Sequence, residues 1–226
     1  VLERETFNGT FTPWTTANAS TGGTPGNAAW TLRQNNYNWN GDIYSSNDQT
    51  QFYLSNSEAQ GASSNTNAAL KSPMLNTIGF STLSLDFYHY YNDNNSDQAR
   101  VQVSTNNLTW TNVATYDNAD FGSLNGFVNA VVNLNSYVGL PSVWVRFLYI
   151  ATNDRSWAID NVSITGTSNR YTYDWNATAG GFTSNEQNPA NYIPTVSAFY
   201  TSSAMNSYGC VVPASPVPVV VNALPT

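Results

Sequence analysis

The sequence contains very little cysteine, histidine and charge. Cys210 and His89 are the only residues of their types, and just 9% of the 226 residues are charged. A single cysteine excludes a disulfide within the chain, so packing or a bound metal has to supply the stability. A single histidine excludes the usual ligand set of a zinc hydrolase, which contains more than one.

Basic residues are also scarce, and long apolar runs are absent. Seven Lys and Arg stand against fourteen Asp and Glu, which gives a net charge of −7. Without a basic cluster to neutralise phosphates, we expect binding neither to nucleic acid nor to an anionic membrane. No run approaches the roughly 18 apolar residues of a transmembrane helix, so membrane insertion is not expected. No signal peptide is visible at Val1, and we expect a mature fragment of a longer protein.

The sequence is rich instead in amide, hydroxyl and aromatic side chains. Asn, Thr and Ser supply most of its polarity, and aromatic residues make up 14% of the chain. A disordered chain would contain few aromatic residues, so this one is expected to fold. Solubility that depends on amides and hydroxyls indicates an extracellular surface, and we expect a secreted or cell-surface protein.

Apolar and polar residues alternate in many short segments, which is the pattern of β-strands. Such segments cover residues 83–91, 101–103, 110–116, 128–134 and 143–149. Many short strands separated by polar turns predict an all-β fold, an antiparallel sandwich or barrel. The less regular region before them, 17–67, is expected to form long loops, where binding sites usually lie.

The segment VWVRFLYIATNDRSWAIDNVSITG contains a change of phase. In an unbroken strand Trp157 and Ile159 would share one face. Val162 and Ile164 would then lie on the opposite face. A strand keeps one apolar face through such a slip only if it carries an extra residue or bends. We therefore predict a β-bulge at Asp160-Asn161, and an acidic residue at that place makes a bound cation a good candidate.

A polar linker, GTSN, follows this segment, and the composition changes beyond it. We expect two domains, residues 1–166 and residues 167–226. The second contains strand-like pieces at 170–175, 195–200 and 217–221, which would form a thin core on their own, so its completeness stays open. Its Cys210 is expected to be a small buried hydrophobe.

Several motifs occur in an order that resembles a known family. They are ETFNGTFTPW at 5–14, AALKSPML at 68–75, LSLDFYHYY at 83–91, ARVQVSTNNLTWTNV at 99–113 and VWVRFLYIATNDRSWAIDNVSITG at 143–166. Together they resemble the jelly-roll adhesin domain of Bacteroidetes surface proteins, a group that includes the cleaved-adhesin and choice-of-anchor J families and is similar in fold to the MAM domain. The resemblance implies an antiparallel jelly-roll β-sandwich over residues 1–166.

The remainder of the chain is similar to the Ig-like or PKD-like repeats of the same bacteria. The order Tyr173 and Trp175, Tyr200, Gly209-Cys210 and the Val-rich segment 217–221 fits such a repeat. The opening strands of the repeat are missing. Either they are absent, or another segment, from this or a neighbouring chain, completes the sheet by strand addition.

The resemblance implies a non-catalytic role outside the cell. Domains of this kind belong to large proteins exported through the type 9 secretion route, and they serve in adhesion. We expect an adhesion module, part of a larger surface protein, that binds a glycan or a surface protein. The alternative is a structural spacer or an assembly subunit of a surface filament, without a ligand of its own; both expectations rest on analogy of fold.

The resemblance also implies a structural Ca²⁺ between the first and last strands. Asp160 would be its ligand from the last strand and Glu5 its partner from the first, with Asn65 or Asn67 from a nearby loop. Where relatives often have a second acid, this chain offers Asn8, whose neutral oxygen would bind more weakly. Ca²⁺ favours hard oxygen ligands of these kinds. The alternative is that Asp160 caps backbone N–H groups of the bulge.

A candidate ligand-binding site lies in the segment NNYNWNGDIY, which contains Tyr37, Trp39, Asp42 and Tyr44. Aromatic rings stack on the C–H faces of sugars, while Asn and Asp bind the hydroxyls, so this segment predicts a glycan platform. The alternative is that Trp39 and Tyr44 pack over one end of the sandwich.

Catalytic residues are not evident in the sequence. His89 shares its strand face with Leu85 and Phe87, which indicates a core histidine. No Gly-x-Ser-x-Gly nucleophile elbow occurs, and no pair of carboxylates stands out for glycoside hydrolysis. We therefore expect no enzymatic activity.

Overall fold

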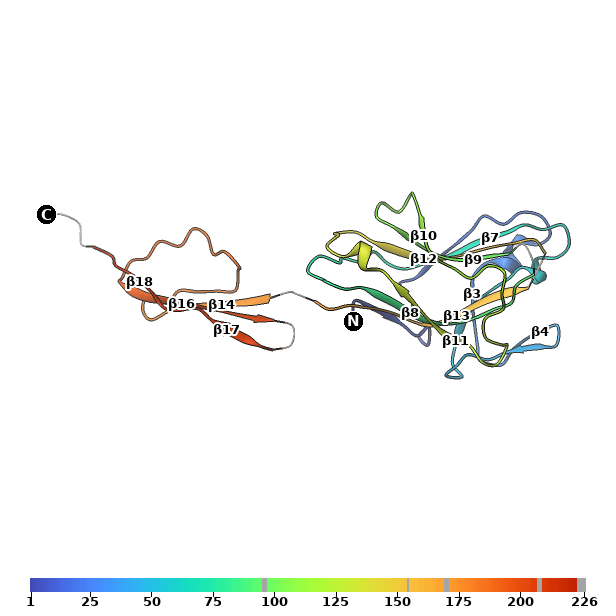
Figure 1. The fold of residues 1–226 in the computed structure, drawn as a ribbon, viewed down its shortest axis with the longest axis horizontal. Coiled ribbons are helices and arrows are strands. Elements are labelled where there is room, and N and C mark those ends of the chain that lie inside the picture. The colour runs from blue at the N-terminus through green and yellow to red at the C-terminus, as the bar shows by residue number, and fades with distance from the viewer. Residues whose placement is uncertain (95–96, 154, 169–170, 207–208, 223–226) are drawn as a thin grey trace. The chain divides into compact units, whose positions relative to one another are not determined.

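The computed structural model describes the chain except residues 95–96, 154, 169–170, 207–208 and 223–226. The chain forms two compact units, Val1–Thr167 and Ser168–Thr226 (Figure 1). In the described residues the strands pair antiparallel, and the helices are three short 3-10 turns: η1 (Pro25–Ala28), η2 (Glu58–Gln60) and η3 (Asn135–Tyr137). None of the described helices has the length and apolar character that crossing a membrane requires. The expected all-β antiparallel class is confirmed.

Two antiparallel sheets and one hairpin build the first unit (Figure 1). The larger sheet has the strand order β11-β8-β13-β6-β3, and β1 pairs with the second half of β13. Its strands are β1 (Glu3–Glu5), β3 (Thr31–Arg33), β6 (Phe52–Asn56), β8 (Ser84–Tyr91), β11 (Val128–Asn133) and β13 (Ser156–Thr165). The smaller sheet has the order β10-β9-β12-β7-β2 and consists of β2 (Thr15–Asn18), β7 (Thr66–Lys71), β9 (Gln98–Ser104), β10 (Thr111–Thr115) and β12 (Trp144–Ala151). The hairpin consists of β4 (Tyr37–Trp39) and β5 (Asp42–Tyr44).

One hydrophobic core fills the space between the two sheets. Alternate residues of the central strands point into it, such as Leu85 of β8 and Phe147 of β12. Trp157 of β13 is fully buried. Its ring meets those of Trp30, Tyr91, Tyr116, Phe147 and Tyr149. Since side chains alternate along a strand, each sheet also has an outer face that the core does not use.

The expected strands are found, and the expected loops of residues 17–67 are interrupted by several short strands. This region contains η1, η2 and the strands from β2 to β6, with three to five residues each. Strands of this length contain too few alternations to show a clear period in the sequence. The polar residues 45–51 between β5 and β6 do form a loop, and this loop covers part of the larger sheet.

The second unit is a single sheet. Its order is β15-β14-β16-β17, and β18 pairs with the first part of β16. Its strands are β14 (Tyr171–Ala177), β15 (Thr183–Ser184), β16 (Ala198–Asn206), β17 (Val211–Pro213) and β18 (Val217–Val219). The expected strand at 170–175 is present from Tyr171, while residue 170 lies outside the described residues. Of the described residues in this unit, Ala198 alone is buried.

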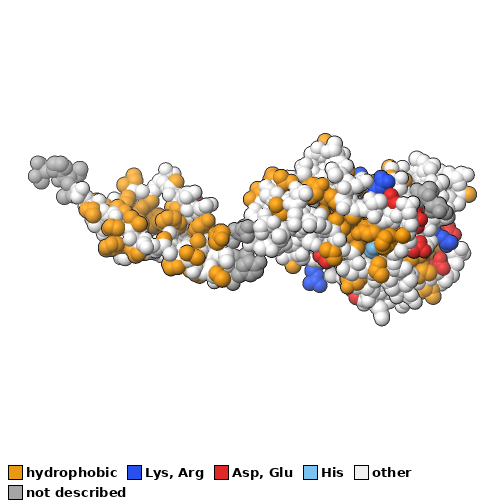
Figure 2. Space-filling model, viewed as in Figure 1, with side chains coloured by type: hydrophobic (Ala, Val, Ile, Leu, Met, Phe, Trp, Pro, Cys, Tyr) orange, Lys and Arg blue, Asp and Glu red, His pale blue; other side chains and the backbone are white. Residues whose placement is uncertain are grey.

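The strand register places apolar side chains on one face of this second sheet. Tyr173 pairs with Ala204, which pairs with Val212, and all three therefore share that face. Val212 is 67% exposed. Figure 2 shows hydrophobic side chains over much of the visible surface of this unit. The expectation that Cys210 is buried is wrong: it is exposed, because a single layer offers no interior to hold it.

Candidate ligand-binding face

β13 contains the β-bulge that the change of phase predicts. Asp160 pairs with Tyr88 of β8, and Ser163 pairs with Asp86, so β13 has one residue more than β8 over this interval. Asn161 adopts a φ of 50°, a left-handed conformation that asparagine tolerates better than most residues. The bulge therefore forms where the sequence provides a residue suited to its geometry.

The extra residue keeps one face of β13 apolar along its length. Val162 and Ile164 return to the core, where Trp157 and Ile159 already lie. Asp160 pairs within the row that faces away from the core, on the outer face of the six-stranded sheet. The bulge thus keeps the apolar side chains of β13 on the core face and places a carboxyl group on the outer face.

Asp160 is fully buried although it lies on the outer face. Its Oδ1 accepts a hydrogen bond from the backbone N–H of Asn161 at 2.7 Å, and its Oδ2 accepts one from Nδ2 of the same residue at 3.3 Å. The bond from the backbone N–H is the capping contact expected from the sequence as the alternative to a metal site. In the described part of the chain the ion pair found joins Arg100 to Asp117, and Asp160 has no cationic partner there.

A second carboxylate, Asp48, lies beside Asp160. Nδ2 of Asn161 also donates to Oδ2 of Asp48 at 2.9 Å, so one amide links the two acids. Burial, and next the charge of Asp48, raise the pKa of Asp160 to about 8. Burial acts to raise the pKa of Asp48 too, but hydrogen bonds from Thr50, Asn161 and Ser46 outweigh it and lower that pKa. Asp48 was missed by sequence reasoning; its only local signal is the polar turn SNDQT.

Glu5 and Asn8 have other partners. β1 pairs with β13 directly after the bulge, which brings Glu5 close to this region. Its carboxylate accepts hydrogen bonds from the backbone N–H of Phe7 and from Oγ1 of Thr12, both at 2.7 Å. Oδ1 of Asn8 accepts from the backbone N–H of Gln51 at 3.1 Å, at the end of the loop that covers Asp160. Asn8 thus contacts this loop, whereas Glu5 pairs with Val162, whose side chain faces the core, so the structure places Glu5 on the opposite face of the sheet from Asp160. The role of Asn8 as a metal ligand stays a prediction.

Asn65 and Asn67 lie elsewhere. Asn67 belongs to β7 and Asn65 directly precedes it, in the five-stranded sheet. Both side chains are exposed. The structure does not bring them to Asp160, because that carboxyl lies on the outer face of the opposite sheet. Among the acids and amides it brings Asp48, Asn47 and Asn161 there instead.

The β4–β5 hairpin contains the four residues predicted to bind a glycan. Tyr37 pairs with Tyr44, and Trp39 pairs with Asp42. Tyr37, Trp39 and Asp42 are half-buried. The guanidinium of Arg33 lies 4.2 Å above the ring of Tyr37, which fixes that ring from one side.

Tyr44 is part of a second hydrophobic cluster on the outer face. It is 3% exposed, and its hydroxyl lies 3.1 Å from Oγ of Ser156. The cluster consists of Tyr44, Phe52, Leu54, Phe127 and Ala158, with Tyr37, Trp39, Tyr88, Tyr90 and Leu124 packed against it. Trp39 and Tyr44 therefore do pack in the structure, as the alternative expectation had it, but over the outer face of a sheet rather than at an end of the sandwich. Their role in ligand binding stays a prediction.

Beyond the hairpin, the outer face of the six-stranded sheet is polar. Three rows of paired residues cross β11, β8 and β13: Asn129–Tyr88–Asp160, Val131–Asp86–Ser163 and Asn133–Ser84–Thr165. Arg4 of β1 extends the middle row beside Ser163. Antiparallel pairing thus gathers hydroxyl, amide and charged side chains from four strands onto one surface.

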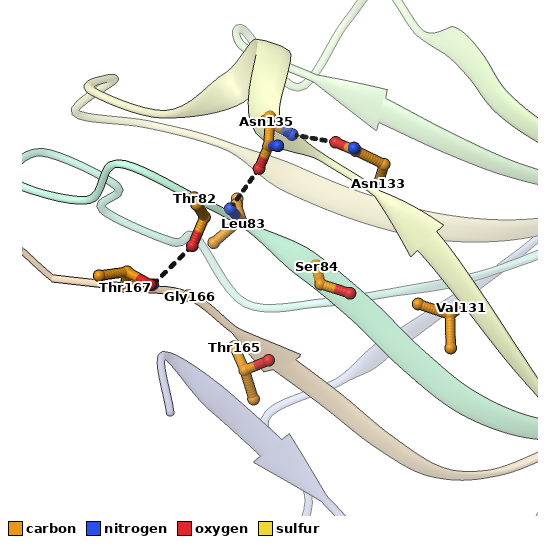
Figure 3. Close-up of a pocket in the computed structure, with 9 residues that line it drawn as sticks. All are labelled: Thr82, Leu83, Ser84, Val131, Asn133, Asn135, Thr165, Gly166 and Thr167. Carbon is orange, nitrogen blue, oxygen red and sulfur yellow. Dashed lines mark hydrogen bonds between the residues drawn. The ribbon is translucent and has the colours of Figure 1, made fainter.

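A shallow pocket of about 530 Å³ lies at the end of this surface (Figure 3). Its polar lining residues are Thr82, Ser84, Asn133, Asn135, Thr165 and Thr167. Figure 3 shows how hydrogen bonds hold two of them: Oδ1 of Asn135 accepts from the backbone N–H of Leu83, and Oγ1 of Thr82 accepts from that of Thr167. Gly166 lies between these segments, where a Cβ would approach the carbonyl oxygen of Thr82 to 2.1 Å. This close approach explains the glycine that ends the WAIDNVSITG motif.

A second pocket of about 370 Å³ lies beside the bulge. It is lined by Val1, Arg4, Asn47, Asp48, Asp86, Tyr88, Asn129, Asn161 and Ser163. The two pockets occupy neighbouring rows of the same face, since Asp86 lies two residues from Ser84 on β8. Asn161, one of the residues at the bulge in β13, lines this second pocket directly.

His89 lies in the core and not at this surface. It is 1% exposed, and its Nδ1 accepts a hydrogen bond from Nε1 of Trp157 at 3.3 Å. Burial lowers its pKa to about 4. The predicted core histidine is confirmed. The described residues contain no group of three or more His, Cys, Asp or Glu that could hold a metal, so a cation at Asp160 would also need amide, hydroxyl or carbonyl oxygens.

Comparison with known proteins shows the fold of the chain. No family model and no curated protein matches it. The K1 cleaved adhesin domain of Lys-gingipain from Porphyromonas gingivalis is 16% identical, with a TM-score of 0.50 over 74% of this chain and 98% of that domain. The K3 domain of the same protein is 18% identical, with a TM-score of 0.51 over 72% of this chain and 97% of that domain. The chain therefore contains an adhesin-like β-sandwich, in agreement with the order of its motifs.

Proposed function

We propose that residues 1–167 form a non-enzymatic adhesion module of a secreted or cell-surface protein, and that this module binds a glycan or a surface protein. The observation that carries the proposal is the outer face of the six-stranded sheet, where polar pockets lie beside an aromatic hairpin. A surface of this kind can stack on apolar sugar faces and bind hydroxyls without any catalytic group. The fold shared with two cleaved adhesin domains makes adhesion the first function to test.

The only histidine supports a binding role over a catalytic one. His89 lies between core rings, 5.2 Å from Phe87 and 4.7 Å from Tyr116 by ring centroids, so no substrate reaches it. Asp160, whose pKa is strongly raised, lies beneath the loop of residues 45–51 and is fully buried. A general acid or base has to come within hydrogen-bonding distance of the reacting group.

The adhesion proposal predicts binding to an immobilised glycan array. We expect the full chain to bind at least one class of glycan in the presence of about 1 mM Ca²⁺, the upper end of the dissociation constants of weak extracellular Ca²⁺ sites. We expect a weaker signal after chelation, because the loop that contains Asp48 forms one wall of the pocket beside the bulge. If the chain binds no glycan on the array, and no free glycan at millimolar concentration, with or without Ca²⁺, the glycan form of the proposal fails.

We further propose that a Ca²⁺ ion binds at Asp160 and stabilises the module. The donor chemistry fits: carboxylate oxygens of Asp160 and Asp48, Oδ1 of Asn47 and Oγ of Ser46 are all hard oxygens. Asp160 is buried without a cationic partner among the described residues, which is costly for an ionised carboxylate. Asn161 already holds Asp48, Asp160 and Asn47 together through its amide. When bound, the ion would supply the positive charge that the protein itself does not place there.

The second unit favours a second candidate function, that of an assembly subunit. A single amphipathic sheet is marginally stable alone and needs another layer over its apolar face. The side chains on that face are uncharged at Tyr171, Tyr173, Val212 and Val217. Two copies can therefore meet there without burying a charge. We propose that the sheet of a neighbouring copy covers this face, which would link chains on the cell surface.

This assembly proposal predicts reversible self-association of the full chain. Sedimentation velocity should show association that increases with concentration in the micromolar range, and Val212→Lys should abolish it because a buried charge at the interface is costly. Val131→Lys is the matched control, since Val131 is 63% exposed and lies in the first unit. A monomer at all concentrations, or equal effects of both substitutions, would contradict the proposal.

A further inference from the structure

The pocket beside the bulge has the composition of a sugar-binding site. Tyr88 contributes an aromatic ring, and amides, hydroxyls and carboxylates surround it. The ring is half-buried and packs against the second hydrophobic cluster on one side. Its partners in the sheet are Asn129 on β11 and Asp160 on β13. The position of the ring is therefore fixed before any ligand arrives, which lowers the entropic cost of binding.

Several polar groups in this pocket are available to a ligand. Among the described residues, no hydrogen bond uses the hydroxyl of Tyr88, the hydroxyl of Ser163 or the guanidinium of Arg4. Within the described part of the chain, the bond that Asp86 accepts is a long one, 3.3 Å, from Oγ of Ser84. Groups that already project from rigid strands can bind hydroxyls in place of water at little cost.

The charges in the pocket favour a neutral ligand over an acidic one. Among the side chains that line the pocket, those of Asp48 and Asp86 place two carboxylates around the ring, against the single guanidinium of Arg4. The chain as a whole has a net charge of −7. An acidic sugar would meet like charges at close range, whereas neutral hydroxyls can donate to these carboxylates in charge-assisted bonds.

The length of the polar face fits a chain of sugars rather than a single one. Tyr88, Asp86 and Ser84 point outward from β8 at intervals of two residues, which covers about 13 Å along the strand. The pocket at Ser84 continues the surface with the hydroxyls and amides of its lining, including those of Thr165 and Asn133. Figure 3 shows these side chains along the neighbouring strands of the face.

We infer that this outer face, from Tyr88 to Ser84 on β8, binds a neutral oligosaccharide. Tyr88 stacks on one sugar ring, and Asp86, Asn129 and Ser163 bind hydroxyls around it. The inference rests on the proposed adhesion function, and it locates the main ligand contact beside the bulge rather than on the β4–β5 hairpin.

The test compares matched substitutions at the two places. The full chain is screened against neutral oligosaccharides from β-glucan, galactan, mannan and xylan, with sialylated and uronic-acid oligosaccharides alongside. The affinity for the strongest probe is then measured by calorimetry for four variants. Tyr88→Ala and Asp86→Asn alter the inferred site, while Trp39→Ala and Asp42→Asn make comparable changes in the hairpin. Melting curves identify any variant that fails to fold, and the isosteric Asp86→Asn keeps the test valid if Tyr88→Ala is one of them.

We expect a neutral probe to bind and its affinity to fall at least 10-fold in Tyr88→Ala and Asp86→Asn, with less than a 3-fold change in the hairpin variants. Binding that is lost in the hairpin variants and kept in the Tyr88 and Asp86 variants would overturn the inference and leave the adhesion proposal intact. A clear preference for acidic probes would overturn the ligand class. Failure of the wild-type chain to bind any probe would overturn both the inference and the glycan form of the proposed function.

Discussion

Without calcium, Asp160→Asn should make the protein more stable at pH 8. The buried carboxyl is neutral only when protonated, and its pKa is raised to about 8 by burial and by the neighbouring Asp48. Asparagine has nearly the same shape and can still accept the hydrogen bond from the backbone N–H of Asn161. It never becomes charged, so the cost of burying an ionised group disappears.

The pH dependence of this effect follows from the direction of the pKa shift. The folded-state pKa of Asp160 lies above its unfolded value, so its favourable contribution is complete below about pH 4 and is lost as the pH rises toward 8. At about 1.4 kcal/mol per pH unit, the stability gap between the variant and the wild type should widen by roughly 4 kcal/mol from pH 5 to pH 8. His89 changes stability in the opposite sense, because its lowered pKa costs stability as the pH falls. The difference between the two proteins, measured by urea unfolding after chelation, isolates Asp160.

Calcium should reverse the order of the two proteins. At pH 8 a large share of the wild-type Asp160 carboxyl is ionised and free to bind the ion, and binding to the folded state raises the melting temperature. Asp160→Asn should show little response to Ca²⁺, while the control Asp42→Asn should respond like the wild type. A wild-type melting curve that is unchanged by chelation, with no metal in elemental analysis, would remove the calcium proposal. The pH effect of the variant would still stand.

Trp157→Ala should be the most destabilising single substitution in the core. Its side chain is fully buried and meets five other aromatic rings between the two sheets. Removing it creates a large cavity and leaves Nδ1 of His89 without its hydrogen bond. We expect a loss of about 3–5 kcal/mol in the free energy of unfolding.

Two other tryptophans serve as controls for this core substitution. Trp39→Ala, at the half-buried hairpin, should cost only about 1 kcal/mol. Trp175→Ala lies in the second unit and should leave the unfolding of the first unchanged. Equal losses in Trp157→Ala and Trp39→Ala, measured by urea unfolding, would contradict the position of the core described above.

The position of the bulge was predictable because it obeys a strict rule. Trp157, Ile159, Val162 and Ile164 can all reach one core only if one extra residue lies between the two pairs. Asn161 supplies that residue and is suited to the left-handed conformation. The alternating strands and the core histidine were predictable for the same reason, since each depends on a period of two along a single strand.

The surroundings of Asp160 were not predictable in this way. Asp48 reaches it from a loop between β5 and β6, and no periodic pattern in the sequence connects the two. The pocket beside the bulge likewise depends on the pairing of β1, β8, β11 and β13, which only the folded sheet provides. The hairpin that contains Trp39 was identified as a site from its composition, yet composition does not reveal that Tyr44 is buried against the outer face of the sheet. Loops and strand order, rather than local propensity, decide which polar residues meet.

The most direct test of the ligand-binding face is to map the bound oligosaccharide by NMR on the isotopically labelled full chain. On titration with the strongest neutral probe, we expect the largest amide shift changes at Asp48, Asp86, Tyr88, Asn129 and Asn161, followed by Ser84 and Thr165. These residues surround the two pockets of the six-stranded sheet. Shift changes confined to the hairpin at residues 37–44, or to the second unit, would contradict the assignment of this face.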